Sequence, residues 1–255
     1  MSRKTSTKKK PIIFYVVTLF PESFESYLKS SILGKAIERG LLRVEFVHPR
    51  DFAYDKHKIV DDRPYAGGAG MVMKAEPIVR AVESVIKKSR TAKTKIVLLA
   101  VAGKQFTNAT AIQWSKLDRI IFISGRYEGI DERATKMLKD VIRGKKNISL
   151  AEVSIGPYIV MGGELPALTM IDSVSRHTLG VLGRQESREE VRYAGLAEQL
   201  GETIAEEKSK TPSLESYTRP PVIKYKGKTY KVPPVLTTGD HKRVAEWKAK
   251  RMKFV

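Results

Sequence analysis

Glycines and carboxylates occur together in segments of this sequence that could build a ligand site. The segment SIGPYIVMGGELP, residues 154–166, holds three glycines among apolar residues, with one carboxylate, Glu164, and no lysine. Glycine permits sharp turns and lets another group approach the main chain closely. The segment therefore predicts either a tight backbone turn or a ligand pressed against the main chain.

Two further glycine-bearing segments, AVAGKQF at 100–106 and GRYEGIDE at 125–132, each follow an apolar run. Ligands of open α/β sheets bind beyond the carboxyl ends of strands. Neither segment matches a phosphate-binding P-loop or the GxGxxG dinucleotide pattern. Backbone groups and apolar walls would suit a flat, largely uncharged moiety such as adenine. Taken one at a time, tight turns explain these segments equally well.

A fourth segment, VDDRPYAGGAGMVM at 60–73, places Asp61, Asp62 and Arg63 before a glycine-rich stretch. One interpretation is a mobile loop that closes over a substrate. The other is an exposed turn with a local ion pair.

Charge indicates the class of partner. Lysine and arginine exceed aspartate and glutamate by 47 − 28 = 19 residues. Such an excess favours a polyanion, either nucleic acid or an anionic membrane, over a merely solvated cationic face. The absence of cysteine excludes disulfides, thiolate zinc sites and cysteine nucleophiles.

The amino-terminal MSRKTSTKKK followed by PIIFYVVTLF superficially resembles a signal peptide. Because the apolar run is short and no small-residue cleavage site follows it, we predict a basic arm leading into a buried strand. No segment approaches the ~18 uninterrupted apolar residues of a membrane-spanning helix.

The elements that position these segments follow from periodicity. Near-continuous apolar runs predict strands covered on both faces at 12–20, 44–47, 96–102 and 120–124. Helical patterns lie between them at 31–40 and 76–90. Strands alternating with helices predict an α/β fold with a mainly parallel sheet.

The carboxyl-terminal part differs in character. Residues 185–211 are highly charged and poor in large apolar side chains, which is typical of a linker or an exposed helix. Basic residues interleaved with aromatics follow. Asp240 is the predicted cap of a final helix whose apolar face includes Val244, Trp247 and Met252.

Several long motifs, in order, resemble the bacterial tRNA (guanine-N1)-methyltransferases of the TrmD type. They are LFPESF, HPRDFAYDKHKIVDDRPYAGGAGMVM, GRYEGIDER, SIGPYIVMGGELPALTMIDSVSRHTLGVLG, YTRP and VPPVL. The resemblance implies a cytoplasmic homodimer of the SPOUT fold, an α/β domain whose carboxyl-terminal part threads a trefoil knot, with the active site at the subunit interface. It also implies methyl transfer from S-adenosylmethionine to N1 of the tRNA guanosine just 3′ of the anticodon, position 37.

The same resemblance implies a division of the chain. After a basic arm of residues 1–11, the methyltransferase domain covers 12–183 and a charged linker covers 184–216. Residues 217–255 then form a shortened, mostly helical, basic tRNA-binding domain.

By resemblance, the donor is bound by the glycine-bearing segments, with residues 154–166 as the knot loop around its adenosine. The implied donor-binding residues are Leu99, Gly125, Glu128, Ile155, Gly156, Pro157, Tyr158, Ile159, Val160, Gly162, Gly163 and Pro166. Arg176 matches an arginine that stabilises charge developing on guanine. A guanidinium can hydrogen-bond O6 as N1 loses its proton.

The chain departs from the family where the general base is expected. The position of the family's aspartate falls on Val191, and Pro157 stands where the family usually has aspartate. Glu190 is the predicted replacement base, with Glu189 as its competitor. Val191 also supports an alternative, an RNA-binding protein of this fold with a weak or lost active site. A knotted methyltransferase for another RNA, and any need for Mg²⁺, stay open.

Overall fold

The computed structural model describes residues 10–183, 212–213, 215–251 and 253–254. The chain divides into two compact units, Met1–Val181 and Leu182–Val255. Each is described by itself.

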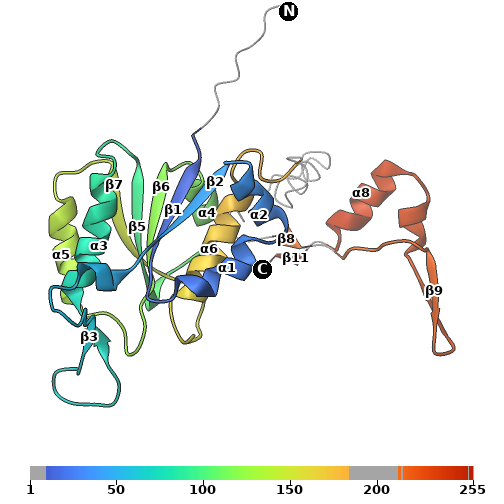
Figure 1. The fold of residues 1–255 in the computed structure, drawn as a ribbon. Helices are drawn as coiled ribbons and strands as arrows, with labels where there is room; N and C mark the ends of the chain where they lie inside the picture. Colours follow the sequence, from blue (N-terminus) through green and yellow to red (C-terminus); the bar gives the residue numbers. More distant parts are fainter. Residues whose placement is uncertain (1–9, 184–211, 214, 252, 255) are drawn as a thin grey trace, which may run out of the picture. The chain divides into compact units, whose positions relative to one another are not determined.

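A parallel sheet forms the centre of the first unit (Figure 1). Its strand order is β2-β1-β6-β5-β7, and every pairing in it is parallel. The strands are β1 (Ile12–Val17), β2 (Leu42–Val47), β5 (Thr94–Gln105), β6 (Arg119–Ile123) and β7 (Ile148–Ser154). The prediction of an α/β fold with a mainly parallel sheet is confirmed. Strand β7 was not predicted, because Ser149 and Glu152 interrupt its apolar residues.

Helices cover both faces of this sheet. One face carries α1 (Glu25–Leu28), α2 (Ser31–Glu38), α4 (Asn108–Trp114) and α6 (Glu164–Arg176). The other face carries α3 (Ala75–Lys87) and α5 (Arg133–Ile142). Predicted helices at 31–40 and 76–90 correspond to α2 and α3. Short 3₁₀ turns at Pro21–Phe24 and Pro49–Phe52 follow β1 and β2.

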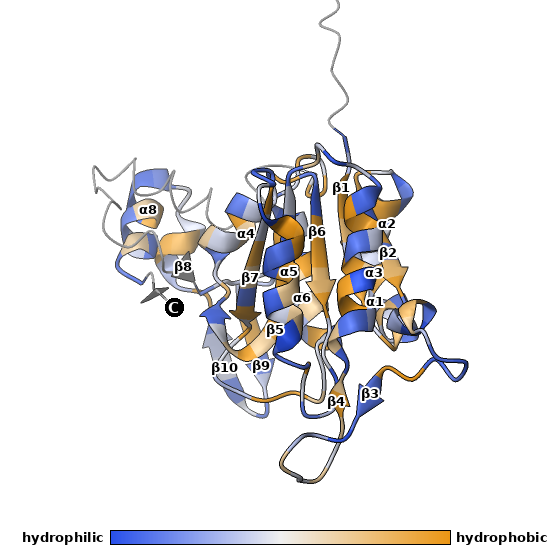
Figure 2. Ribbon diagram, turned by 90° about the vertical axis from the view of Figure 1, so that its left-hand side faces the viewer, coloured by the Kyte–Doolittle hydropathy of each residue, from blue (hydrophilic) through white to orange (hydrophobic). Residues whose placement is uncertain are grey.

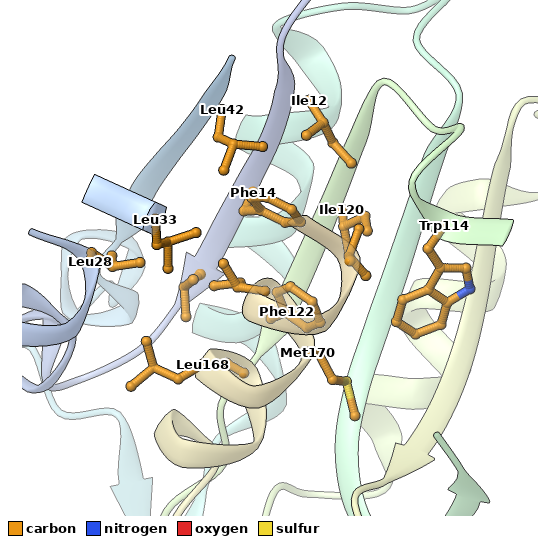
Figure 3. Close-up of a cluster of buried hydrophobic side chains, with 14 of the residues drawn as sticks. Ile12, Phe14, Leu28, Leu33, Leu42, Trp114, Ile120, Phe122, Leu168 and Met170 are labelled. Carbon is orange, nitrogen blue, oxygen red and sulfur yellow. The ribbon is translucent and has the colours of Figure 1, made fainter. Parts of the chain in front are cut away.

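Two apolar cores result, one on each face of the sheet. Phe14 and Phe122 point into the first core, where their rings stack with centroids 6.3 Å apart (Figure 3). Their strand neighbours Tyr15 and Ile121 point into the second core. Both sides of β1 and β6 are therefore buried, which explains their near-continuous apolar sequences and the apolar colour of the strands in Figure 2.

Strand β5 extends to Gln105, so the predicted strand at 96–102 continues through most of the glycine-bearing segment 100–106, which was expected to be a loop. Leu99 and Lys104 both pair with Val153 of β7, so the residues between them form a bulge in the strand. Gly103 allows the close approach, because a Cβ there would lie 2.5 Å from the Val153 nitrogen. The bulge still falls at the end of the strand where a ligand was predicted.

The second unit combines a helix with a hairpin. Asp240 caps α8 (His241–Ala249), because its carboxylate accepts hydrogen bonds from the Lys242 and Arg243 amides at 3.1 Å. The cap prediction is confirmed. The helix ends at Ala249, and Met252, which was expected on its apolar face, lies outside the described residues.

The hairpin pairs β9 (Val222–Tyr225) with β10 (Lys228–Lys231). Its two-residue turn has positive φ at Lys226 and Gly227, as a type I′ turn requires. A 3₁₀ turn at Pro234–Thr237 and a short pairing of β8 (Pro212–Ser213) with β11 (Lys253–Phe254) complete the described part. The described part therefore contains strand as well as helix, whereas a mostly helical domain was expected.

Candidate active site

A cavity of about 460 Å³ lies at the carboxyl ends of β5, β6 and β7. It is lined by the β5 bulge, by the loop after β6 and by the loop between β7 and α6. The structure therefore brings the three glycine-bearing segments together at one edge of the sheet, where open α/β folds bind ligands.

Most residues expected to bind the donor lie in this lining. They are Leu99, Gly125, Glu128, Ile155, Tyr158, Ile159, Val160, Gly162, Gly163 and Pro166. Gly156 and Pro157 belong to the same loop but do not line the cavity. That these side chains contact a methyl donor stays a prediction.

The paired glycines before α6 permit close packing of the two loops. Gly163 donates a backbone hydrogen bond to the Gly125 carbonyl at 2.9 Å. A Cβ at Gly163 would lie 2.5 Å from the Ser124 Cα, and one at Gly162 would lie 2.6 Å from the Arg126 Cδ. The glycines are thus required by packing of the protein against itself, as well as by any ligand in the cavity.

Glu164 begins α6 and is buried, with 3% of its surface exposed. One carboxylate oxygen accepts a hydrogen bond from the Thr18 hydroxyl at 2.7 Å, and the other lies 2.9 Å from the Arg126 Nε. The positive end of the α6 dipole also favours a carboxylate at this position. Glu164 therefore joins the segment after β1 to the loop after β6.

Arg126 was not predicted, although it lines the cavity. Its Nε and the Glu164 oxygen form an ion pair whose angle is not that of a hydrogen bond. Its guanidinium carbon also lies 4.4 Å from the centre of the Phe20 ring, a cation–π contact. No local sequence pattern predicts these contacts, because they join segments that are distant in the chain.

The other charged side chains of the lining are three carboxylates. They belong to Glu128, Glu132 and Glu152. Of these, only Glu128 was predicted. The cavity therefore carries more negative than positive charge, and this favours a ligand with cationic groups.

A second cavity, of about 1240 Å³, adjoins the first and shares Glu128, Ile130 and Glu132 with it. Its other lining residues come from β3 (Asp61–Asp62), β4 (Val72–Met73), residues 63–65 at the start of the glycine-rich segment between them, and the starts of α3 and α5. The exposed Asp62 pairs with Lys74 at 3.6 Å, so the local ion pair of this segment does not involve Arg63. Closure of the segment over a substrate stays a prediction.

Asp131 also lines this second cavity, and it precedes α5. Hydrogen bonds from the Arg133 side chain hold the pKa of Asp131 below its ordinary value. The Arg133 amide also donates to its carboxylate at 2.9 Å. Asp131 is therefore ionised at neutral pH and fixes the start of the helix, which makes it a structural group in this wall.

Arg176 does not line either cavity. It is the last residue of α6, which places it about 18 Å along the helix axis from Glu164. Glu190, Glu189 and Val191 lie outside the described residues. One chain alone therefore does not bring Arg176 to the predicted donor cavity.

The described residues lack both a cluster of metal-binding side chains and a membrane-spanning helix. They contain no group of three or more His, Cys, Asp or Glu side chains placed to hold a metal ion. They contain no helix long and apolar enough to cross a membrane.

Comparison with known proteins gives one consistent result. Residues 12–254 match the family model described as tRNA (Guanine-1)-methyltransferase TrmD. A relative from Idiomarina loihiensis is 40% identical over 240 residues, covering 94% of this chain and 83% of the relative. One from Clostridioides difficile is 40% identical over 235 residues, covering 92% and 90%. Both relatives are named tRNA (guanine-N(1)-)-methyltransferase.

Proposed function

The chain belongs to the tRNA (guanine-1)-methyltransferase family, and on that premise we propose that it methylates N1 of the tRNA guanosine just 3′ of the anticodon, position 37. S-adenosylmethionine is the methyl donor. The observation that carries this proposal is the single cavity lined by residues of all three glycine-bearing segments. The family match over nearly the whole chain supplies the reaction.

The residues of the cavity fit this donor. The donor carries a sulfonium, an ammonium and one carboxylate, and the lining carries three carboxylates and one guanidinium. Leu98, Leu99 and Ile130 offer apolar surface to the adenine. When bound, the donor supplies the methyl group to be transferred.

Two side chains act on the guanine in this proposal. Loss of the N1 proton moves negative charge to O6, where the Arg176 guanidinium hydrogen-bonds. Glu190 accepts the proton, one residue before the expected aspartate position. The neighbouring Val191 cannot accept a proton.

We also infer a trefoil knot and a homodimer. The knot loop is residues 154–166. Beside the cavity, Ile159 is 83% exposed, Met161 94% and Leu165 63%, which supports a subunit interface at this face. Because Arg176 lies about 18 Å along α6 from Glu164, we place Arg176 of the partner subunit at each cavity.

A mixed dimer tests this arrangement. One subunit carries Gly163→Ala, which damages the cavity, and the other carries Arg176→Ala. If each site combines the cavity of one subunit with Arg176 of the other, one site is intact and about half of the activity returns. If both come from one subunit, activity stays as low as in the two parent homodimers. Dimers of wild-type subunits with the same two purification tags are the control.

The second unit supports tRNA as the partner. Its hairpin exposes Tyr225 and Tyr230 beside Lys224, Lys228 and Lys231. Tyrosine faces can stack on unpaired bases, and lysines bind phosphates, which dominate nucleic-acid affinity. The net charge of +19 agrees with a polyanionic partner.

The deciding experiment is methylation of a purified tRNA transcript, followed by mapping of the modified base. We expect 1-methylguanosine next to the anticodon, and none in a transcript whose guanosine 37 is replaced by adenosine. Binding of donor and tRNA without methyl transfer would favour the RNA-binding alternative. A methyl group at another base, or only on another RNA, would favour a different knotted methyltransferase.

A further inference from the structure

Arg126 is the only cationic side chain among the described residues that line the first cavity. The ligand proposed for this cavity has two cationic groups and one carboxylate. Glu128, Glu132 and Glu152 attract the cationic groups and repel the carboxylate. Electrostatics therefore leaves one position in the lining that favours the ligand's carboxylate, and it lies beside Arg126.

The contacts of Arg126 hold one edge of its guanidinium and leave the other edge accessible. The Nε is buried against Glu164 at 2.9 Å, and the Phe20 ring lies under the guanidinium plane. Neither terminal nitrogen has a hydrogen-bond acceptor among the described residues, and neither is a buried unsatisfied atom. A quarter of the side chain, 25%, is exposed.

We propose that Arg126 binds the carboxylate of the donor's methionine moiety through its two terminal nitrogens. This proposal rests on the proposed function and names the part of the donor that Arg126 recognises. A guanidinium and a carboxylate match in geometry and form paired charge-assisted hydrogen bonds.

Glu164 and Gly162 position the arginine. A Cβ at Gly162 would lie 2.6 Å from the Arg126 Cδ and Nε, so only glycine leaves room for the arginine beside the loop. Glu164 fixes the Nε edge, which orients the terminal nitrogens before the ligand arrives. Pre-organisation of this kind reduces the entropy lost on binding.

Calorimetry with two ligands tests the proposal. S-adenosylmethionine has the carboxylate, whereas 5′-methylthioadenosine lacks the whole amino-acid moiety. For Arg126→Gln we expect an approximately 10- to 100-fold loss of S-adenosylmethionine affinity, the size of a lost charge-assisted hydrogen-bond pair. We expect methylthioadenosine affinity to stay within about twofold, because its contacts do not include Arg126.

Other outcomes separate the possible roles. Equal losses for both ligands would mean that Arg126 only holds the loops together, and no loss for either would mean that it does not contact the ligand. Both results overturn the proposal. A wild-type protein that binds neither ligand would instead contradict the proposed donor cavity itself.

Two controls keep the test independent of folding. Arg143→Gln removes an exposed arginine that follows α5 and pairs with Asp140, and it should change neither affinity. If Arg126→Gln does not fold, the test uses Arg126→Lys instead, and decarboxylated S-adenosylmethionine takes the place of 5′-methylthioadenosine. The unaltered protein must then bind the decarboxylated ligand more weakly than S-adenosylmethionine. Arg126→Lys must reduce that difference in affinity. Equal affinities of the unaltered protein for the two ligands would overturn the proposal.

Discussion

Glu190→Gln is expected to slow methyl transfer in a single turnover by at least about 10²-fold, with tRNA binding retained. Glutamine keeps the shape of the side chain but cannot accept the N1 proton of guanine. Single-turnover kinetics isolates the chemical step from product release. Glu190 lies outside the described residues, so the expectation rests on its place beside Val191 and on the need for a base.

Glu189→Gln is the matched control, since it removes the same charge one residue away. On a helix the two side chains would point about 100° apart, so only one of them can face the substrate. Normal transfer by Glu190→Gln and slow transfer by Glu189→Gln would move the assignment by one residue. Normal transfer by both variants would mean that the two carboxylates are solvated surface charges and that the base lies elsewhere.

Gly163→Val is expected to weaken S-adenosylmethionine binding by more than about 10²-fold. The Cβ alone would lie 2.5 Å from the Ser124 Cα and 3.1 Å from the Gly125 nitrogen. These are backbone atoms, which cannot rotate away as a side chain does. To relieve the clash, the wall of the cavity must shift. We expect this shift to cost more free energy than the roughly 1–3 kcal/mol of an overpacked core. Calorimetry measures the affinity, and thermal melting checks that the variant is folded.

Substitutions at two other glycines are compared with Gly163→Val. At Gly183, no atom of the described residues would meet an added Cβ within 4 Å, so Gly183→Ala should bind the donor normally. At Gly156, the Cβ would meet the Tyr158 ring at 2.4 Å. That ring can turn aside, but Gly156 has a φ of +158°, which residues with a Cβ rarely adopt, so Gly156→Val should also weaken donor binding. A folded Gly163→Val protein with unchanged affinity would remove Gly163 from the site.

Periodicity predicted the central part of the fold. Strands β1 and β6 were evident because both of their faces are buried. Strand β7 and the β5 bulge were missed, since a half-exposed strand with Glu152 lacks a continuous apolar run and a bulge depends on its partner strand. The hairpin turn at Lys226 and Gly227 was missed because strongly basic strands hide the apolar signal that marks a hairpin.

The candidate site was predicted by resemblance, and periodicity added only the idea that glycine-bearing loops meet at one sheet edge. Arg126 and Thr18 were missed because their roles depend on Glu164, and Phe20 was missed because it contacts Arg126; each of these partners is remote in the chain. Local patterns carry no information about such contacts. Glu164 itself was noted only as a carboxylate near glycines.

The hydrogen bond between Thr18 and Glu164 spans 146 residues, and this has a consequence for synthesis on the ribosome. At about 5–20 residues per second, a nascent chain waits about 7 to 30 s between translation of the two residues. Until residues 119–123 are made, β1 can pair with β2 but lacks β6, its other neighbour, and α6, which covers one face of the sheet, is made later still. The apolar strand therefore stays partly uncovered during translation, a period in which chaperones can bind it and in which premature release would leave an aggregation-prone fragment.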